Sequence, residues 1–285
     1  MSDRQWTLLL LLPAMAVIGV LFFGGLLIGV MRSFNYMPVI GLTEPDFDAY
    51  IHIFSEPEFY WSLLLSLHIA FTSTLISAVI AIAAALMLRR SFMGRGVINF
   101  LFQLNLTVPH LVGAIGILYL FSQSGSFARL GVAMGLIVQP ADFPALVFDP
   151  YAIAIIAQYV WKEVPFIGVI VLANMQSIGE DYEAVARSLG ASPWQAFRHV
   201  LLPLILPGVV SASVLVFAFT FGAYEIPAVL GAHYPAALPV LAYRSYTDVD
   251  LATRPEAMAM AVVIAVVSAV LIAVYLRATR RAGGR

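Results

Sequence analysis

The sequence contains 285 residues, of which 61% are hydrophobic and 11% are charged. Soluble domains are about half apolar and about a quarter charged, so this composition excludes a soluble fold and predicts an integral membrane protein. The formal net charge of -1 gives no reason to expect a nucleic-acid partner, and the absence of cysteine excludes disulfides and thiolate chemistry.

Six segments are apolar enough, and long enough, to cross a bilayer as helices, which requires about 20 residues each. They cover residues 6–31, 60–88, 97–121, 151–173, 204–229 and 257–276. Continuous rather than alternating apolar runs predict an all-α bundle and not a β-barrel. A cleaved signal peptide is the alternative for the first segment, but its apolar run continues well past Ala14-Met15-Ala16, the nearest match to a cleavage site.

Proline and glycine residues within these segments, Pro109 among them, are expected to permit kinks rather than to end helices. No linker in the chain is long enough to hold a soluble domain, so we expect a single transmembrane domain over residues 1–285.

Arginine is concentrated in the segments that are cytoplasmic if the N-terminus lies inside. These arginines are Arg4, Arg89, Arg90, Arg95, Arg187, Arg198, Arg277, Arg280, Arg281 and Arg285. The outer loops then hold Arg32, Arg129, Arg244 and Arg254. By the positive-inside rule, both termini are predicted to be cytoplasmic.

The segment 177–203, between the fourth and fifth spans, is polar in an otherwise apolar chain. Ser177 followed by Glu180 is a capping-box pattern that predicts a helix over 178–188. Glu183 and Arg187 are spaced to form an ion pair along that helix.

The end of this helix and the start of a second one are marked by their own residues. Gly190 lies where a left-handed C-cap would end the first helix. Ser192, followed by Pro193 and then Gln195, predicts the N-terminus of a second helix over 193–200 that runs into the fifth span.

A helix, a glycine elbow and a second helix attached to a span could transmit movement from a partner. Ala184, Ala186 and Ala191 would let that partner approach closely. The alternative is an amphipathic segment that rests on the membrane through Trp194 and Phe197. The spacing alone does not decide between them.

The segment resembles the EAA loop of ABC importer permeases, in which Glu-Ala-Ala is followed by three residues, glycine, nine residues and Ile-x-Leu-Pro. Here nine residues separate Gly190 from Val200-Leu201-Leu202-Pro203, and Glu183 lies one residue before the aligned triplet Ala184-Val185-Ala186. The similarity extends to AFTFGAYEIPAVLG at 218–231 and PHLVGAIG at 109–116, and is greatest to permeases of the spermidine/putrescine type.

This resemblance implies a type I ABC importer permease with the MetI-like fold, in the bacterial cytoplasmic (inner) membrane, and a polyamine or similar small solute as substrate. It implies three partners: a second permease, identical or different, an ATPase dimer inside the cell that binds ATP and magnesium, and an external solute-binding protein. The residues implied for ATPase coupling are Glu183, Ala184, Arg187, Gly190, Ala191, Pro193, Val200, Leu202 and Pro203.

The chain lacks the motifs of an enzyme. Lys162 is the only lysine, and no glycine-rich loop precedes it, so the sequence contains no P-loop for ATP. The histidines show no metal-ligand spacing, and no catalytic set can be assembled. We therefore expect no catalytic residue, metal or cofactor in this chain, and energy from a partner ATPase or an ion gradient.

Ionisable residues inside the spans are candidates for the solute path. Lys162 and Glu163, beside Trp161, lie near the middle of the fourth span, where they either line the path or pair structurally with neighbouring helices. Glu225, next to Tyr224 in the fifth span, would suit an ammonium-bearing solute or bond another helix. The alternative function is a gradient-driven carrier that uses Lys162, Glu163 and Glu225 as its ion relay.

Overall fold

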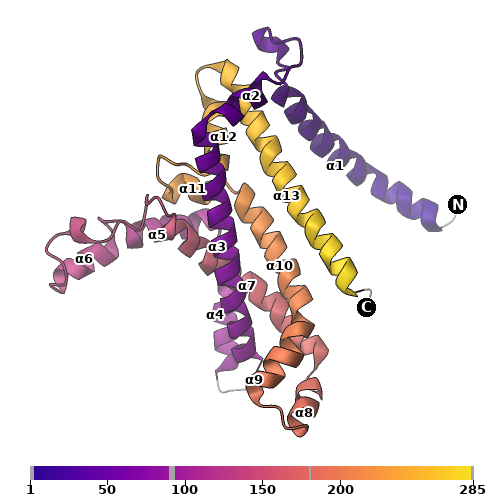
Figure 1. Ribbon diagram of the computed structural model, residues 1–285, viewed down its shortest axis with the longest axis vertical. Coiled ribbons are helices and arrows are strands. Elements are labelled where there is room, and N and C mark those ends of the chain that lie inside the picture. The colour runs from indigo at the N-terminus through magenta and orange to yellow at the C-terminus, as the bar shows by residue number, and fades with distance from the viewer. Residues whose placement is uncertain (1–2, 90–93, 180, 284–285) are drawn as a thin grey trace. The chain divides into compact units, whose positions relative to one another are not determined.

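The computed structural model describes residues 3–89, 94–179 and 181–283, which are helical apart from connecting loops and one isolated β-bridge (Figure 1). Six of its helical segments are long and apolar enough to cross a membrane: Gln5–Ser33, Pro57–Leu88, His110–Ala133, Ile153–Ile178, Pro193–Gly222 and Leu251–Arg277. The prediction of an all-α, six-span protein is confirmed. Arg90, Glu180 and Arg285 lie outside the described residues, as do the side chains of Arg4, Arg280 and Arg281.

The chain divides into two compact units, and each unit is discontinuous in sequence. One contains residues 1–60 and 238–266, and the other contains residues 61–237 and 267–285. Helices α3 (Pro57–Leu88) and α13 (Arg254–Gly283) each contribute to both units. The expectation of one domain therefore stays a prediction.

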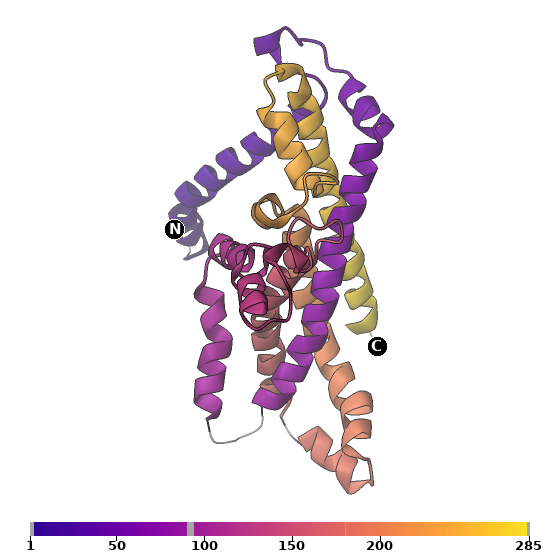
Figure 2. The same ribbon diagram turned by 90° about the vertical axis from the view of Figure 1, so that its left-hand side faces the viewer.

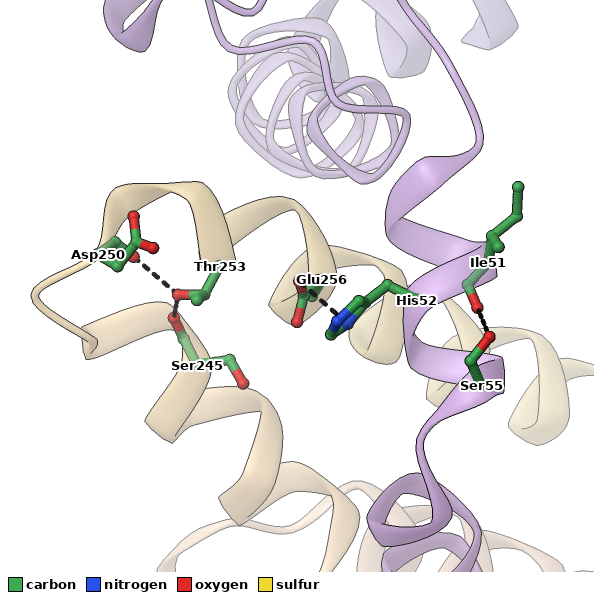
Figure 3. A network of polar contacts seen from close by, with 7 residues as sticks. All are labelled: Ile51, His52, Ser55, Ser245, Asp250, Thr253 and Glu256. Carbon is green, nitrogen blue, oxygen red and sulfur yellow. Dashed lines mark hydrogen bonds and ion pairs between the residues drawn. The ribbon is translucent and has the colours of Figure 1, made fainter.

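The first unit is formed by α1 (Asp3–Ser33), η1 (Pro38–Ile40), α2 (Asp48–Ser55), α12 (Leu238–Thr247), η4 (Leu251–Thr253) and the first part of α13. Polar contacts hold α2 against α13. Figure 3 shows His52 of α2 facing Glu256 of α13, with Nδ1 3.3 Å from Oε1. Nearby, the Thr253 hydroxyl donates to the carbonyl of Ser245 at 2.6 Å, which joins η4 to α12.

The second unit contains the rest of α3 and α13 with α4 (Arg95–Thr107), α5 (His110–Phe121), α6 (Ser126–Ala133), η2 (Pro140–Asp142), α7 (Ile153–Ile178), α8 (Asp181–Ser188), α9 (Pro193–Ala196), the π-helical turn η3 (Phe197–Leu201), α10 (Leu202–Gly222) and α11 (Glu225–Leu230). Its core lies where α3, α7 and α10 meet. The buried side chains there are Ala81, Ala85, Ile167, Val171, Met175, Leu201, Ile205, Val209, Ala212 and Val216.

The third predicted span, 97–121, is wrong as a single helix. It is two helices, α4 and α5, separated at Val108-Pro109, and Figure 2 shows the change of direction. Val108 is extended, as residues before proline usually are, and Pro109 has no N–H with which to continue α4. Pro109 thus ends a helix where we expected only a kink.

The boundaries of the fourth and fifth spans also differ from the prediction. α7 continues to Ile178, so Ser177 lies in its last turn and donates to the Asn174 carbonyl instead of capping a new helix. α10 ends at Gly222, and Ala223 is extended. In an unbroken helix the ring of Pro227 would clash with the carbonyl of Ala223, so a separate α11 follows.

Candidate functional site

The polar segment between α7 and α10 folds as two short helices joined at Gly190. α8 ends in a Schellman motif, in which the Gly190 N–H donates to the Arg187 carbonyl at 3.0 Å and the Ala191 N–H donates to the Ala186 carbonyl at 3.1 Å. Gly190 has a φ of +92°, and an added Cβ would meet no atom within 4 Å. The predicted elbow is confirmed, and it requires glycine for backbone conformation rather than for space.

The second helix begins as its sequence predicts. The Gln195 N–H donates to the Ser192 hydroxyl at 3.2 Å, and the Ser192 N–H donates to the Gln195 side chain at 2.8 Å, with Pro193 at the first helical position. The chain then passes through the π-helical turn into α10 with right-handed helical angles throughout. The elbow is therefore joined to the fifth span without a break, as Figure 1 shows for α9 and α10.

An ion pair ties the elbow to the end of α3. Arg89, just after α3, donates through Nη1 to Oε1 of Glu183 at 2.8 Å and through Nη2 to Oε2 at 2.5 Å. Each side chain is 20% exposed, and two parallel bonds of this kind fix orientation as well as distance. The predicted pair of Glu183 with Arg187 is wrong, because Glu183 faces Arg89 instead.

A cavity of about 770 Å³ lies between the end of α3 and the two short helices. It is lined by Leu86, Arg89, Glu183, Ala184, Arg187, Pro193, Trp194, Ala196, Phe197 and Leu201. Four of the predicted coupling residues are therefore in its wall. Of the others, Gly190 and Ala191 connect α8 to α9, and Val200, Leu202 and Pro203 lie in or directly after the π-helical turn.

Lys162 is buried, and its side chain caps the C-terminal end of α4. Its Nζ donates to the carbonyls of Asn105 at 2.7 Å and Val108 at 2.6 Å, the last turn before Pro109. In return, the Asn105 side chain donates to the carbonyl of Trp161. A cation at the C-terminal end of a helix is favourable, because the partial negative charge of the helix dipole and the last carbonyls are concentrated there.

Glu163 faces different helices from those that Lys162 faces, as expected for adjacent residues of a helix. Its Oε1 accepts from the Thr220 hydroxyl of α10 at 2.6 Å, and its Oε2 accepts from the Ser77 hydroxyl of α3 at 3.2 Å. Both charged residues also border a cavity of about 310 Å³. Its lining consists of Leu106, His110, Lys162, Glu163, Phe166, Leu215, Val216 and Phe219.

The other predicted path residues are not part of this cavity lining. Glu225 is exposed at the start of α11, and Tyr224 precedes it. Trp161 is 43% exposed. Sequence reasoning missed Arg89 as the partner of Glu183 and the hydroxyls that hold Glu163, because these partners come from distant parts of the chain.

Comparison with known proteins identifies the family. Residues 77–282, which include both the elbow and the charged residues of α7, match the model for the binding-protein-dependent transport system inner membrane component. The chain belongs to this family. It is a multi-pass inner-membrane permease, and its fold is that of type I ABC importer permeases.

Individual relatives of this permease support the family assignment. It is 33% identical to the molybdenum transport system permease protein ModB of Mycobacterium tuberculosis over 67% of this chain and 69% of the relative. It is 25% identical to the trehalose/maltose transport system permease protein MalF of Thermococcus litoralis, over 95% and 92% of the two chains. Among solved structures, a bacterial ABC transporter that imports alginate matches with a TM-score of 0.81 and 21% identity, over 98% and 96% of the chains.

The ion pair of this permease allows a direct test of its geometry. Replacing Arg89 or Glu183 singly with alanine is expected to lower thermal stability, and the double replacement should cost less than the sum of the two. The coupling energy should be about 1–2 kcal/mol, between the values for exposed and for buried pairs. Thermal unfolding of the detergent-solubilised variants measures it, and strict additivity of the single effects would contradict the bidentate pair.

Proposed function

We propose that this permease forms the solute path of an ABC importer and that the elbow formed by Asp181–Leu201 receives the partner ATPase on the cytoplasmic side. The observation that carries the proposal is the helical elbow itself. It lies at the end of a span, is continuous with α10, and is held to α3 by the bidentate ion pair.

The exposed apolar residues along α8 are evidence that a partner protein binds this face of the elbow. Tyr182 and Val185 of α8 and Leu189, directly after α8, follow one another at helical spacing and are 59%, 59% and 84% exposed. Glu183 and Arg187 line the cavity behind them. An apolar stripe on a short water-facing helix is typical of a surface that fits a groove on another protein.

The elbow can carry movement because both of its ends are attached. Glu183 holds α8 to the end of α3, and Leu201 anchors the start of α10 in the core with Ile205. Movement of the ATPases toward each other would therefore shift α10 against α7, and with it the wall of the 310 Å³ cavity. This is a mechanism of alternating access driven by a partner.

The full complex that we propose has the partners implied by the resemblance. A second permease, identical or different, completes the path, a solute-binding protein delivers the solute from outside, and ATP and magnesium are bound by the ATPase dimer. The arginine distribution supports cytoplasmic termini.

For the substrate we propose a small solute and test a polyamine first. Glu225 and Tyr224 are exposed neighbours in the sequence, and a carboxylate with an aromatic ring suits an ammonium group through charge pairing and cation–π contact. The names of the relatives refer to molybdenum, to trehalose and maltose, and to alginate. Competition between labelled spermidine and an excess of molybdate or maltose, measured as uptake into proteoliposomes, distinguishes these classes.

The experiment that tests the importer assignment is purification of the tagged permease with its bound proteins. We expect ATP hydrolysis that vanadate inhibits and solute uptake that requires ATP. Uptake that a protonophore abolishes and vanadate leaves unchanged would instead favour a carrier with Lys162, Glu163 and Glu225 as its relay.

The apolar stripe gives a local prediction. Leu189→Glu places a carboxylate on the proposed docking face and should reduce the ATPase recovered with the permease about tenfold or more, since burying an unpaired charge is costly. Val249→Glu, at a 98% exposed position of the other unit, is the matched control and should leave recovery unchanged. Equal recovery with both variants would exclude this face of α8 from the interface.

A further inference from the structure

The connection between α9 and α10 contains a π-helical turn, Phe197–Leu201. At its end the Leu202 N–H donates to the carbonyl of Phe197, five residues earlier, where an α-helix would use the carbonyl four residues earlier. One residue more than an α-helix requires is thus held in this turn. Single π-turns of this kind are uncommon and occur frequently at functional positions.

Pro203 supplies a physical cause for this turn. It has no N–H for the carbonyl of His199, and in a regular helix its ring would clash with that carbonyl. A side chain also takes part, because Nδ1 of His199 lies 3.2 Å from the carbonyl of Gln195. The backbone hydrogen bonding of the helix is therefore weaker in this turn than in the helices on either side.

The segments on both sides of the turn are firmly held. On one side the capping box of Ser192 and Gln195 fixes the start of α9. On the other side Leu201, the last residue of the turn, and Ile205 of α10 are 1% and 0% exposed in the core with α7. A weak turn between two fixed ends is the place where bending costs least.

We propose that the π-helical turn Phe197–Leu201 is the joint at which the elbow moves relative to α10 during transport. This rests on the proposed importer function and adds to it that α9 and α10 do not move as one rigid rod. A return of the turn to α-helical bonding would rotate α9 by about 100° around the helix axis, the angle of one residue. Such a register change has two discrete states, as a switching element requires.

The joint is tested by distances between spin labels, for which the chain is suited because it has no native cysteine. One pair, Trp194→Cys in α9 with Gly222→Cys at the end of α10, crosses only the π-helical turn. The matched pair, Leu204→Cys with Gly222→Cys, lies within α10. Between the nucleotide-free complex and the complex trapped with ADP and vanadate, the first distance should change and the second should not. An unchanged first distance in a complex that hydrolyses ATP would overturn the joint and leave the importer assignment standing.

A pair of proline variants gives an independent test. Pro203→Ala restores the missing N–H and should stiffen the joint, so uptake should fall about tenfold while vanadate-sensitive ATP hydrolysis persists. Pro207→Ala restores an N–H one turn later, inside α10, and should transport like the parent protein. If α9 and α10 were a rigid rod, Pro203→Ala would transport as well as or better than the parent, and that result would overturn the proposal. Loss of ATP hydrolysis in the parent complex would instead contradict the proposed function itself.

Discussion

Valine in place of Gly190 is expected to abolish ATP-driven uptake while the permease still inserts and still binds its ATPase. The residue has a φ of +92°, which a β-branched side chain adopts only at a cost of about 1–3 kcal/mol. Nothing lies within 4 Å of the added Cβ, so the effect comes from backbone strain and not from a clash. A strain of this size is enough to change the angle between α8 and α9. In our proposal, the coupling of ATP hydrolysis to uptake depends on that angle. Uptake and ATP hydrolysis measured on the same proteoliposomes would show hydrolysis separated from transport.

Two further substitutions make the Gly190 result specific. Asparagine tolerates the left-handed conformation, so Gly190→Asn should retain most of the uptake. Gly41 has a φ of +87° with equally open surroundings in the other unit, so Gly41→Val introduces the same strain away from the elbow and should leave coupling intact. Normal uptake in Gly190→Val, or equal losses in Gly41→Val, would remove the coupling role from the elbow.

Local patterns predicted the elbow correctly because its determinants are close in sequence. Gly190 ends one helix and Ser192 begins the next through hydrogen bonds that reach no more than five residues. Hydropathy likewise predicted the number of spans, because lipid requires long apolar helices. These are features in which one segment of chain determines its own structure.

Hydropathy failed to predict the helix ends where one apolar run forms two separate helices. The runs containing Pro109 and Pro227 are as apolar as an unbroken helix, so composition does not mark the ends of α4 and α10. Proline is tolerated inside other spans of this chain, including Pro165 within α7. Whether a helix breaks depends on other donors for the freed carbonyl. At Pro109 that carbonyl belongs to Asn105, and Lys162 donates to it from another helix.

Pairings between distant segments could not be predicted at all. Arg89 and Glu183 are 94 positions apart, and the nearer Arg187 offered a plausible but wrong partner at helical spacing. The hydroxyls of Ser77 and Thr220 reach Glu163 from two other helices. The sequence therefore indicated which residues carry charge but not which groups bind them, and the roles of Lys162 and Glu163 stayed open.

Lys162→Met decides between those roles, and we expect a loss of stability larger than that of any neighbouring substitution. Methionine has a similar length but no donor, so the carbonyls of Asn105 and Val108 lose the ammonium that closes α4. The Asn105 carbonyl still accepts from the Val108 N–H at 3.1 Å, so the cost falls mainly on the Val108 carbonyl. A buried acceptor left without a partner costs about 1–3 kcal/mol. The permease should therefore unfold at a lower temperature in detergent, and protein that remains folded should show reduced uptake.

Glu163→Gln is the matched control, because it changes the adjacent residue and leaves the bonds of Lys162 in place. The glutamine oxygen can still accept from Thr220, so the variant should unfold close to the temperature of the parent protein. If Lys162 acted only as a charge on the solute path, Lys162→Met would instead lose uptake and keep the parent's stability. Since the Lys162 ammonium binds two backbone carbonyls where α4 ends before α5, we expect stability to respond first and uptake to follow from it.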